Sequence, residues 1–174
     1  MKKVAFFSAF LFLCFFIKAQ DLHQYPFGFQ FIDETLYLVD LTNFSSIDQL
    51  MDSGHYELTE TQKIIPKHFT KEQDVLLYLF CFDGQREAGW IIKVMDTIGF
   101  KPATLQELLA LGSSFPGLQQ KFPIVALGST WSNSWCDKMV GKLDTFKFHR
   151  QFSWSCRSEG VKFKGKTRFL AVEK

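Results

Sequence analysis

The side chains best suited to bind a ligand lie in two segments near the C-terminal end of the chain, WSNSWCDK (131–138) and FHRQFSWSCR (148–157). Both segments combine large aromatic rings with amide, carboxylate and guanidinium groups. Flat apolar faces with polar edges are typical of grooves that bind sugars or peptides. The predicted ligand-binding residues are Trp131, Asn133, Trp135, Asp137, His149, Arg150, Trp154 and Arg157.

The tryptophans in these segments have a second possible role, because a small domain also uses such rings to fill its core. For Trp131 the core and the binding site are equally good interpretations. Trp135 is surrounded by polar residues, which favours a position facing a ligand. The arginines have a corresponding alternative, in which they are only solvated.

Catalytic chemistry finds little support in the residue pattern. Ser129 follows an apolar run, but the G-x-S-x-G motif of serine hydrolases is absent. The four histidines are scattered without the spacing of metal ligands. A thiol enzyme using Cys81 would need that residue exposed beside a base, whereas its neighbours are Phe80 and Phe82. We therefore predict no catalytic residue, no metal and no cofactor.

The cysteine positions predict one disulfide. Beyond residue 20 the chain has Cys81, Cys136 and Cys156, so one thiol is left over. Cys81 lies in the apolar run VLLYLFCF, where a small buried thiol packs well. Cys136 and Cys156 share the polar and aromatic C-terminal third, and closing that loop stabilises a fold by about 3 kcal/mol. We expect a bridge between Cys136 and Cys156 and a free Cys81.

Residues 1–20 have the features of a secretory signal peptide. Two lysines precede the apolar run VAFFSAFLFLCFFI, which has the length that such signals use. An uncleaved anchor is the alternative, and a lipoprotein is disfavoured because the bulky Leu13 precedes Cys14. We expect an exported protein, periplasmic or secreted, with no stable membrane insertion after cleavage.

Charge is unevenly distributed along the remaining chain. Residues 1–20 hold three lysines and no acid, which leaves 17 bases and 18 acids. Residues 21–137 carry a net −8 and residues 138–174 a net +7. The basic end could serve an anionic partner, or the two halves of one domain could attract each other. The many aromatic residues of the basic end favour a folded segment over a binding tail, and we predict no nucleic-acid partner.

Hydrophobic periodicity predicts an α+β protein with one domain over residues 21–174, because helices precede a run of strands. The polar segment 55–70 is expected to be a loop. The predicted strands cover 35–41, 74–82, 122–131, antiparallel strands within 144–154, and 168–174. The predicted helices cover 45–54, 84–99 and 104–111.

The helix over 104–111 has the clearest sequence signals. Thr104 stands three residues before Glu107, the spacing of a capping box. Pro102 lies just before the cap, and Gly112 is placed to end the helix in a left-handed turn. None of these residues is a nucleophile or a metal ligand, so we expect the helix to be part of the scaffold.

The segments GFKPATLQELLALG, FPIVALGS and RFLAVEK together resemble a family of small, uncharacterised bacterial proteins that share this block nearly word for word. The resemblance spans roughly residues 36–174. It implies no activity, because none is established for the family. Members of the family mostly lack an export signal, so this chain departs from them there.

More distantly, GFKPATLQEL followed by a W-x-S strand and a terminal RFLAV is similar to the layout of bacterial C-type-lectin-like domains. This resemblance implies a mainly antiparallel sheet in which the chain ends pair, two or three short helices, and a long, irregular region for binding. The related sulfatase-activating enzymes use an active cysteine pair on the same fold. The calcium-site tripeptide of the lectins is absent, and Asn133 with Asp137 offers too few oxygens.

These observations together favour an exported, non-catalytic binding module of C-type-lectin-like type. Its expected ligand is a glycan or a protein partner of the cell envelope. The alternatives are a small enzyme on the same fold and a structural or interaction protein of the envelope.

Overall fold

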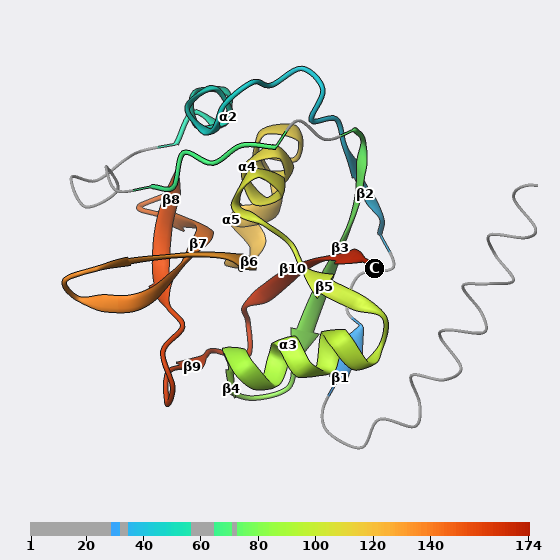
Figure 1. The fold of residues 1–174 in the computed structure, drawn as a ribbon, viewed down its shortest axis with the longest axis vertical. Coiled ribbons are helices and arrows are strands. Elements are labelled where there is room, and N and C mark those ends of the chain that lie inside the picture. Colours follow the sequence, from blue (N-terminus) through green and yellow to red (C-terminus); the bar gives the residue numbers. More distant parts are fainter. Residues whose placement is uncertain (1–28, 32–34, 57–64, 71–72) are drawn as a thin grey trace, which may run out of the picture.

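The computed structural model describes residues 29–31, 35–56, 65–70 and 73–174, and its elements are labelled in Figure 1. The predicted signal peptide and part of the predicted 55–70 loop lie outside the described residues. The strands are β1 (Phe29–Phe31), β2 (Tyr37–Val39), β3 (Val75–Phe82), β4 (Arg86–Glu87), β5 (Phe100–Pro102), β6 (Ile124–Asn133), β7 (Cys136–Phe146), β8 (His149–Cys156), β9 (Lys162–Phe163) and β10 (Arg168–Glu173). The helices are α2 (Ile47–Gly54), α3 (Ala88–Thr97), α4 (Leu105–Ser114) and α5 (Leu118–Lys121).

The described strands form one eight-stranded sheet and a small two-stranded ribbon of β4 and β9. The main sheet has the order β1-β3-β10-β6-β7-β8, while β2 adds to β3 and β5 adds to β10. Only β6 and β10 run parallel among these pairs. The predicted α+β class and the mainly antiparallel sheet are therefore confirmed, whereas the described residues form four helices rather than the expected two or three.

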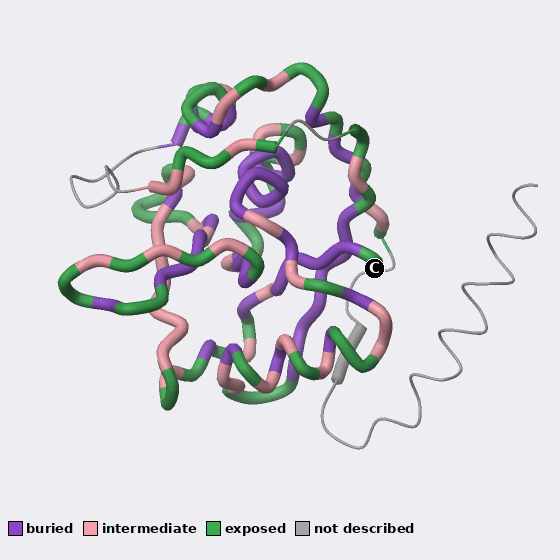
Figure 2. The backbone as a smooth tube through the Cα atoms, viewed as in Figure 1, coloured by how far each residue is buried: buried purple, intermediate pink, exposed green. Residues whose placement is uncertain are grey.

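Helices cover both faces of this sheet, with α3 on one side and α2 and α4 on the other (Figure 1). The α2/α4 side buries Leu108, Leu143 and Phe152, and the α3 side buries Ile91, Met95 and Phe80. The alternating strand positions explain the two cores, since successive side chains of a strand point to opposite faces. The central strands and α4 are accordingly the most buried backbone in Figure 2.

The sequence predicted the positions of β2, β3, β6, β8, β10, α2, α3 and α4 with shifted ends, but it placed no strand over residues 136–143, which form most of β7. The helix expected at 45–54 is α2, which begins after the cap residue Ser46 and ends at His55 in a left-handed conformation. The helix expected at 84–99 begins only at Ala88, because 86–87 pair with β9 instead. Gly99 follows it with a φ of 84°.

Gly112 does not end α4, contrary to the sequence prediction. The helix continues to Ser114 and ends at Phe115. A Cβ atom at Gly112 would lie 2.6 Å from Cδ1 of Leu143. The glycine therefore permits a close approach between α4 and β7, and its small size rather than its backbone freedom explains its position.

The capping box of α4 is present. The Thr104 side chain accepts the N–H of Glu107, and the Glu107 carboxylate accepts the N–H of Thr104. Replacing Thr104 with alanine removes one of these two caps, so we expect the free energy of unfolding to fall by about 1 kcal/mol. Thr104→Ser keeps an acceptor oxygen and should stay close to the native value in urea unfolding. An unchanged midpoint for Thr104→Ala would contradict the capping role.

Candidate functional site

The turn between β6 and β7 presents Trp135 to solvent. The Asn133 carboxamide oxygen accepts the backbone N–H groups of Trp135 and Cys136, both at 2.9 Å. This arrangement is an Asx turn, in which a short polar side chain replaces a backbone partner. The Trp135 side chain is 85% exposed. Hydrogen bonds thus fix the backbone of the turn, while its largest side chain packs very little against the protein interior.

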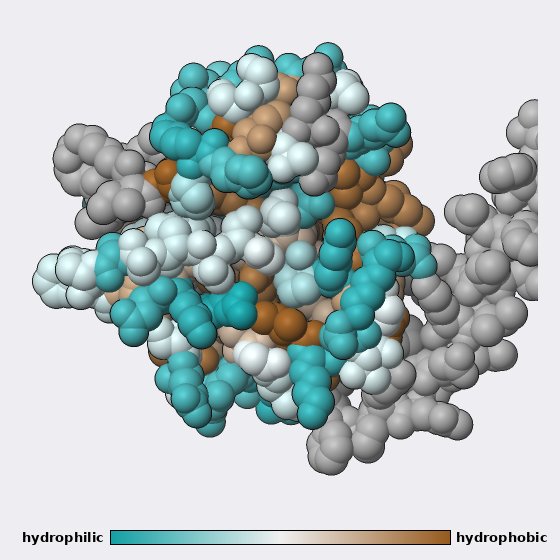
Figure 3. Space-filling model, viewed as in Figure 1, coloured by the Kyte–Doolittle hydropathy of each residue, from teal (hydrophilic) through white to brown (hydrophobic). Residues whose placement is uncertain are grey.

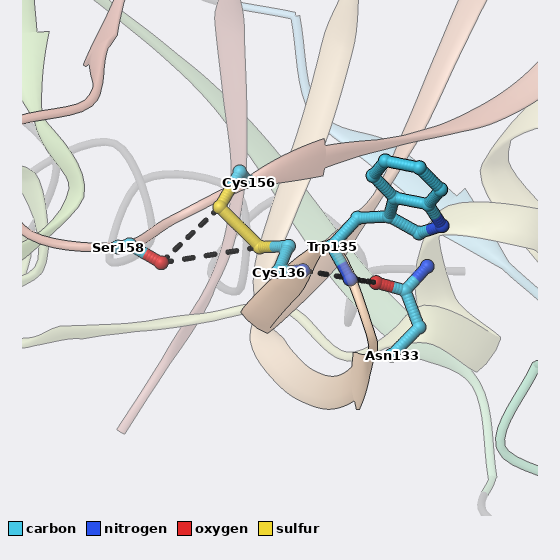
Figure 4. Close-up of a disulfide and its surroundings, with 5 residues drawn as sticks. All are labelled: Asn133, Trp135, Cys136, Cys156 and Ser158. Carbon is cyan, nitrogen blue, oxygen red and sulfur yellow. Dashed lines mark hydrogen bonds between the residues drawn. A yellow bond between two sulfur atoms is a disulfide. The ribbon is translucent and has the colours of Figure 1, made fainter.

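The predicted disulfide is present directly behind this turn. Cys136 and Cys156 are joined and so connect the start of β7 to the end of β8. The Ser158 hydroxyl lies 3.1 Å from the Cys156 sulfur. Figure 4 shows the indole of Trp135 directed away from the sulfur atoms. The covalent link anchors the base of the turn and leaves the ring free to contact a partner.

The β6–β7 hairpin projects from the body of the protein, as the orange ribbon at the left of Figure 1 and the corresponding projection in Figure 3 show. Asp137 follows the disulfide cysteine and is exposed beside this turn. Ser132 and Ser134 are exposed as well. The exposed segment on either side of Trp135 therefore carries hydroxyl, amide and carboxylate groups.

Trp131 and Trp154 lie nearer the body of the domain. Trp131 is partly buried against the core on the α2/α4 side. Trp154 is partly buried opposite Gly141, in the row of β8 that also contains the buried Phe152. For Trp131 the structure therefore supports the core role that the sequence left open.

Arg157 is engaged by the protein itself. Its guanidinium donates to the Leu127 carbonyl at 2.6 Å, and its backbone N–H donates to the Lys138 carbonyl at 2.7 Å. Burial lowers the pKa of the Arg157 guanidinium below its usual value. The side chain links the end of β8 to β6 and thereby supports the base of the β6–β7 hairpin.

Arg150 and His149 lie at the opposite end of β8 from the disulfide. The Arg150 guanidinium donates to the Gly112 carbonyl and lies 5.0 Å from the ring centre of Tyr56. Arg150 and Cys156 are six positions apart along β8, a distance of about 20 Å at the usual rise of a strand. The eight predicted residues therefore do not line one groove. Trp135, Asn133 and Asp137 lie together, whereas His149 and Arg150 are elsewhere.

Sequence reasoning missed two exposed aromatic residues at the turn between β7 and β8. Phe148 is 99% exposed and Phe146 is 56% exposed. Both lie in the segment 144–154, for which the sequence predicts antiparallel strands. Alternation of aromatic and polar residues is typical of a strand that faces a core on one side. The pattern alone therefore predicts that these aromatic side chains are buried.

A hollow of about 420 Å³ lies at the start of α4, and none of its lining residues is a predicted binding residue. Its lining residues are Val75, Lys101, Pro102, Thr104, Glu107, Gly128, Val172 and Glu173. The polar groups of Thr104 and Glu107 are used by the capping box. The nearby Ser129 hydroxyl accepts the Leu105 N–H at 2.9 Å. The side chains of Thr104, Glu107 and Ser129 therefore stabilise the start of α4.

The remaining reactive group is the free thiol of Cys81, which is buried as predicted. Burial raises the pKa of the Cys81 thiol above its usual value, and this effect outweighs the Arg168 guanidinium 2.7 Å from the sulfur. A neutral, buried thiol is a poor nucleophile. In the described part of the chain, no group of three His, Cys, Asp or Glu side chains is placed to hold a metal ion. No helix there is long and apolar enough to cross a membrane.

Comparisons with known proteins do not suggest a function, so a functional proposal must rest on the geometry of the site. The chain matches no protein-family model, no curated protein and no solved structure.

Proposed function

We propose that this protein is an exported, non-catalytic binding module that contacts a glycan through the tip of its β6–β7 hairpin. The observation that carries the proposal is the 85% exposure of Trp135 on a turn held by Asn133 and by the adjacent disulfide. A protein partner of the cell envelope is the second candidate, favoured by the same exposed ring. We name the residues Ser132–Asp137 the tryptophan turn.

An exposed tryptophan on an ordered turn can bind a ligand with little loss of conformational entropy in the backbone. Two hydrogen bonds and a covalent link already order the turn, so little conformational entropy remains to be lost when a ligand binds. The indole presents a flat apolar face to the C–H groups of a sugar ring, while the indole N–H offers a polar edge. Asp137 and the exposed serines are placed to accept or donate hydrogen bonds to hydroxyl groups.

A non-catalytic role fits the chemistry of the cysteines. The cysteine pair of the sulfatase-activating enzymes must exist as thiols during part of its cycle, whereas Cys136 and Cys156 are joined at the base of a structural hairpin. Cys81 is buried with a raised pKa. These features argue against an oxidase on the same fold.

We also propose the C-type-lectin-like assignment as the finer description of the fold. It is supported by the mainly antiparallel sheet, the short helices and the presence of both β1 and β10 in one sheet. In this chain β3 lies between β1 and β10, so the terminal strands do not pair directly. Export is proposed from the signal-like residues 1–20 and agrees with the use of a disulfide.

The proposal predicts that Trp135→Ala separates binding from stability. Removing an 85% exposed ring should change the free energy of unfolding by no more than about 0.5 kcal/mol. Binding should weaken by about 30-fold, as for a contact residue worth about 2 kcal/mol. Binding is measured on an immobilised glycan panel and on cell-envelope extracts, and the melting temperature is measured in parallel.

Two matched variants test the interpretation. Trp135→Phe keeps an aromatic face and should retain part of the affinity. Phe146→Ala removes an exposed ring at the other end of β7 and should leave glycan binding intact. A large loss of stability for Trp135→Ala, with no ligand found on the panel or in the extracts, would remove the basis for the proposal.

A further inference from the structure

The turn between β7 and β8 has an unusual backbone for its residues. Phe146 pairs with His149, so only Lys147 and Phe148 connect the two strands. Their φ angles are 48° and 72°, both in the left-handed region. Two-residue hairpins with this geometry strongly prefer Asn and Gly, because a side chain crowds the backbone there. A lysine followed by a phenylalanine is therefore a locally unfavourable choice.

The same turn exposes more apolar surface than any need of the fold explains. The Phe148 side chain is 99% exposed and that of Phe146 is 56% exposed. Strained backbone is concentrated at functional sites, and adjacent exposed apolar side chains mark surfaces that contact a partner. We name residues 146–149 the phenylalanine tip.

The surroundings of the phenylalanine tip are basic. The Lys147 ammonium lies 5.3 Å from the ring centre of Phe146. From Thr145 to Phe152, the residues nearest the tip, the sequence contains two basic residues, Lys147 and Arg150, and no acid. The next acid along β7 is Asp144, which pairs with Lys142 at 2.7 Å. The tip thus combines two aromatic rings with a positive charge.

The base of this hairpin is braced against the helices. The Gln119 carboxamide donates to the Asp144 carbonyl at 2.6 Å and to the Gln151 carbonyl at 3.3 Å. Arg150 donates to the Gly112 carbonyl at the C-terminal end of α4. These contacts fix both strands just below the tip, so the rings project from a rigid support.

We propose that the phenylalanine tip binds reversibly to an anionic lipid surface. Phe146 and Phe148 enter the interface between headgroups and acyl chains, and Lys147 remains among the anionic headgroups. A convex tip that carries two rings around one cation needs no shaped pocket in its partner, and a fluid interface offers none. Aromatic burial and attraction of basic residues to anionic lipid are the two contributions that hold peripheral proteins at membranes. This contact lies at the opposite end of β7 from the tryptophan turn and does not rest on glycan binding.

The test measures co-sedimentation of the purified protein with vesicles. One set contains phosphatidylcholine alone and the other contains equal parts of phosphatidylcholine and phosphatidylglycerol. The native protein should bind the anionic vesicles more strongly, and added salt should weaken that binding. Lys147→Gln should reduce the partition coefficient on anionic vesicles by about fivefold, the effect of one basic residue near such a surface.

The decisive variant is Phe148→Gly. Glycine accepts the 72° φ angle without crowding, so the melting temperature should stay the same or rise. Vesicle binding should nevertheless fall at least about tenfold, because the most exposed ring is gone. Phe146→Ala provides a second variant with a loss in the same direction. A protein that is equally or more stable and binds vesicles less cannot owe that loss to unfolding.

Trp135→Ala is the matched control, since it removes an exposed ring in the turn next to the other end of β7. It should bind vesicles as the native protein does. The proposal is wrong if the native protein binds neither vesicle preparation, which would point to a protein partner for the tip. It is equally wrong if Phe148→Gly binds like the native protein, or if Trp135→Ala loses vesicle binding to the same extent.

Discussion

Replacing Cys136 and Cys156 together with serine is expected to lower the free energy of unfolding by about 3 kcal/mol. The bridge closes a loop with a sequence separation of 20 residues, and this loop contains the whole of β7 and of β8. Without the bridge, the unfolded chain regains the freedom that the cross-link removes. In the folded state, β7 and β8 keep their ladder of hydrogen bonds, so the variant should fold with lower stability.

Reductant provides the control for this prediction. It should lower the urea midpoint of the native protein to that of the double-serine variant and leave the variant itself unchanged. Non-reducing mass spectrometry should find Cys136 joined to Cys156. Cys81 should react with a thiol reagent only after denaturation, because its side chain is buried. A bridge that includes Cys81, or a variant that reductant destabilises further, would contradict the pairing.

Local signals were sufficient for the features that depend on neighbouring residues. Thr104 and Glu107 stand three positions apart, and the capping box needs nothing further from the rest of the fold. The continuous apolar run around Cys81 likewise specified a strand buried on both faces, because helices cover both sides of β3. The Cys136–Cys156 bridge joins two strands and was predictable for a different reason, because the buried run around Cys81 left only these two cysteines to pair.

The candidate site was harder to predict because its arginines find partners far away in the sequence. Arg157 donates to a carbonyl of β6, and Arg150 donates to a carbonyl of α4. The sequence pattern of an arginine near aromatic residues is the same for an arginine that binds a ligand and for one that hydrogen-bonds to a neighbouring element. Only the strand register shows that β8 carries Arg150 and Cys156 at opposite ends.

Exposure of the aromatic residues depends on the hairpins rather than on residue type. Trp131 and Trp135 are four residues apart, yet one packs on a core and the other is exposed. Irregular register between β6 and β7 near Trp131 determines which side chains face inward there. No period in the sequence reveals such an irregularity, and polar neighbours were the only available guide.

Gly128→Ala should destabilise the protein by about 2–3 kcal/mol, through a contact that fixes the start of α4 against β6. A Cβ atom at this position would lie 2.5 Å from the Pro102 carbonyl oxygen and 2.6 Å from that of Ala103. Both obstacles are backbone atoms of the segment that leads into α4, so neither can rotate away. The Gly128 N–H also donates to the Ala103 carbonyl at 2.9 Å. A shift that relieves the clash would weaken this hydrogen bond.

Gly89→Ala is the matched control, because a Cβ atom there meets nothing within 4 Å. Gly89 lies in α3, where alanine should stabilise the helix by about 0.5–1 kcal/mol. The two glycine-to-alanine changes should therefore shift the urea midpoint in opposite directions, with the slope of the transition unchanged. Equal midpoints for Gly128→Ala and the native protein would mean that β6 and the 102–103 segment are not in close contact. A loss confined to Gly128→Ala would instead identify this contact as a support for β6, the strand that leads to the tryptophan turn.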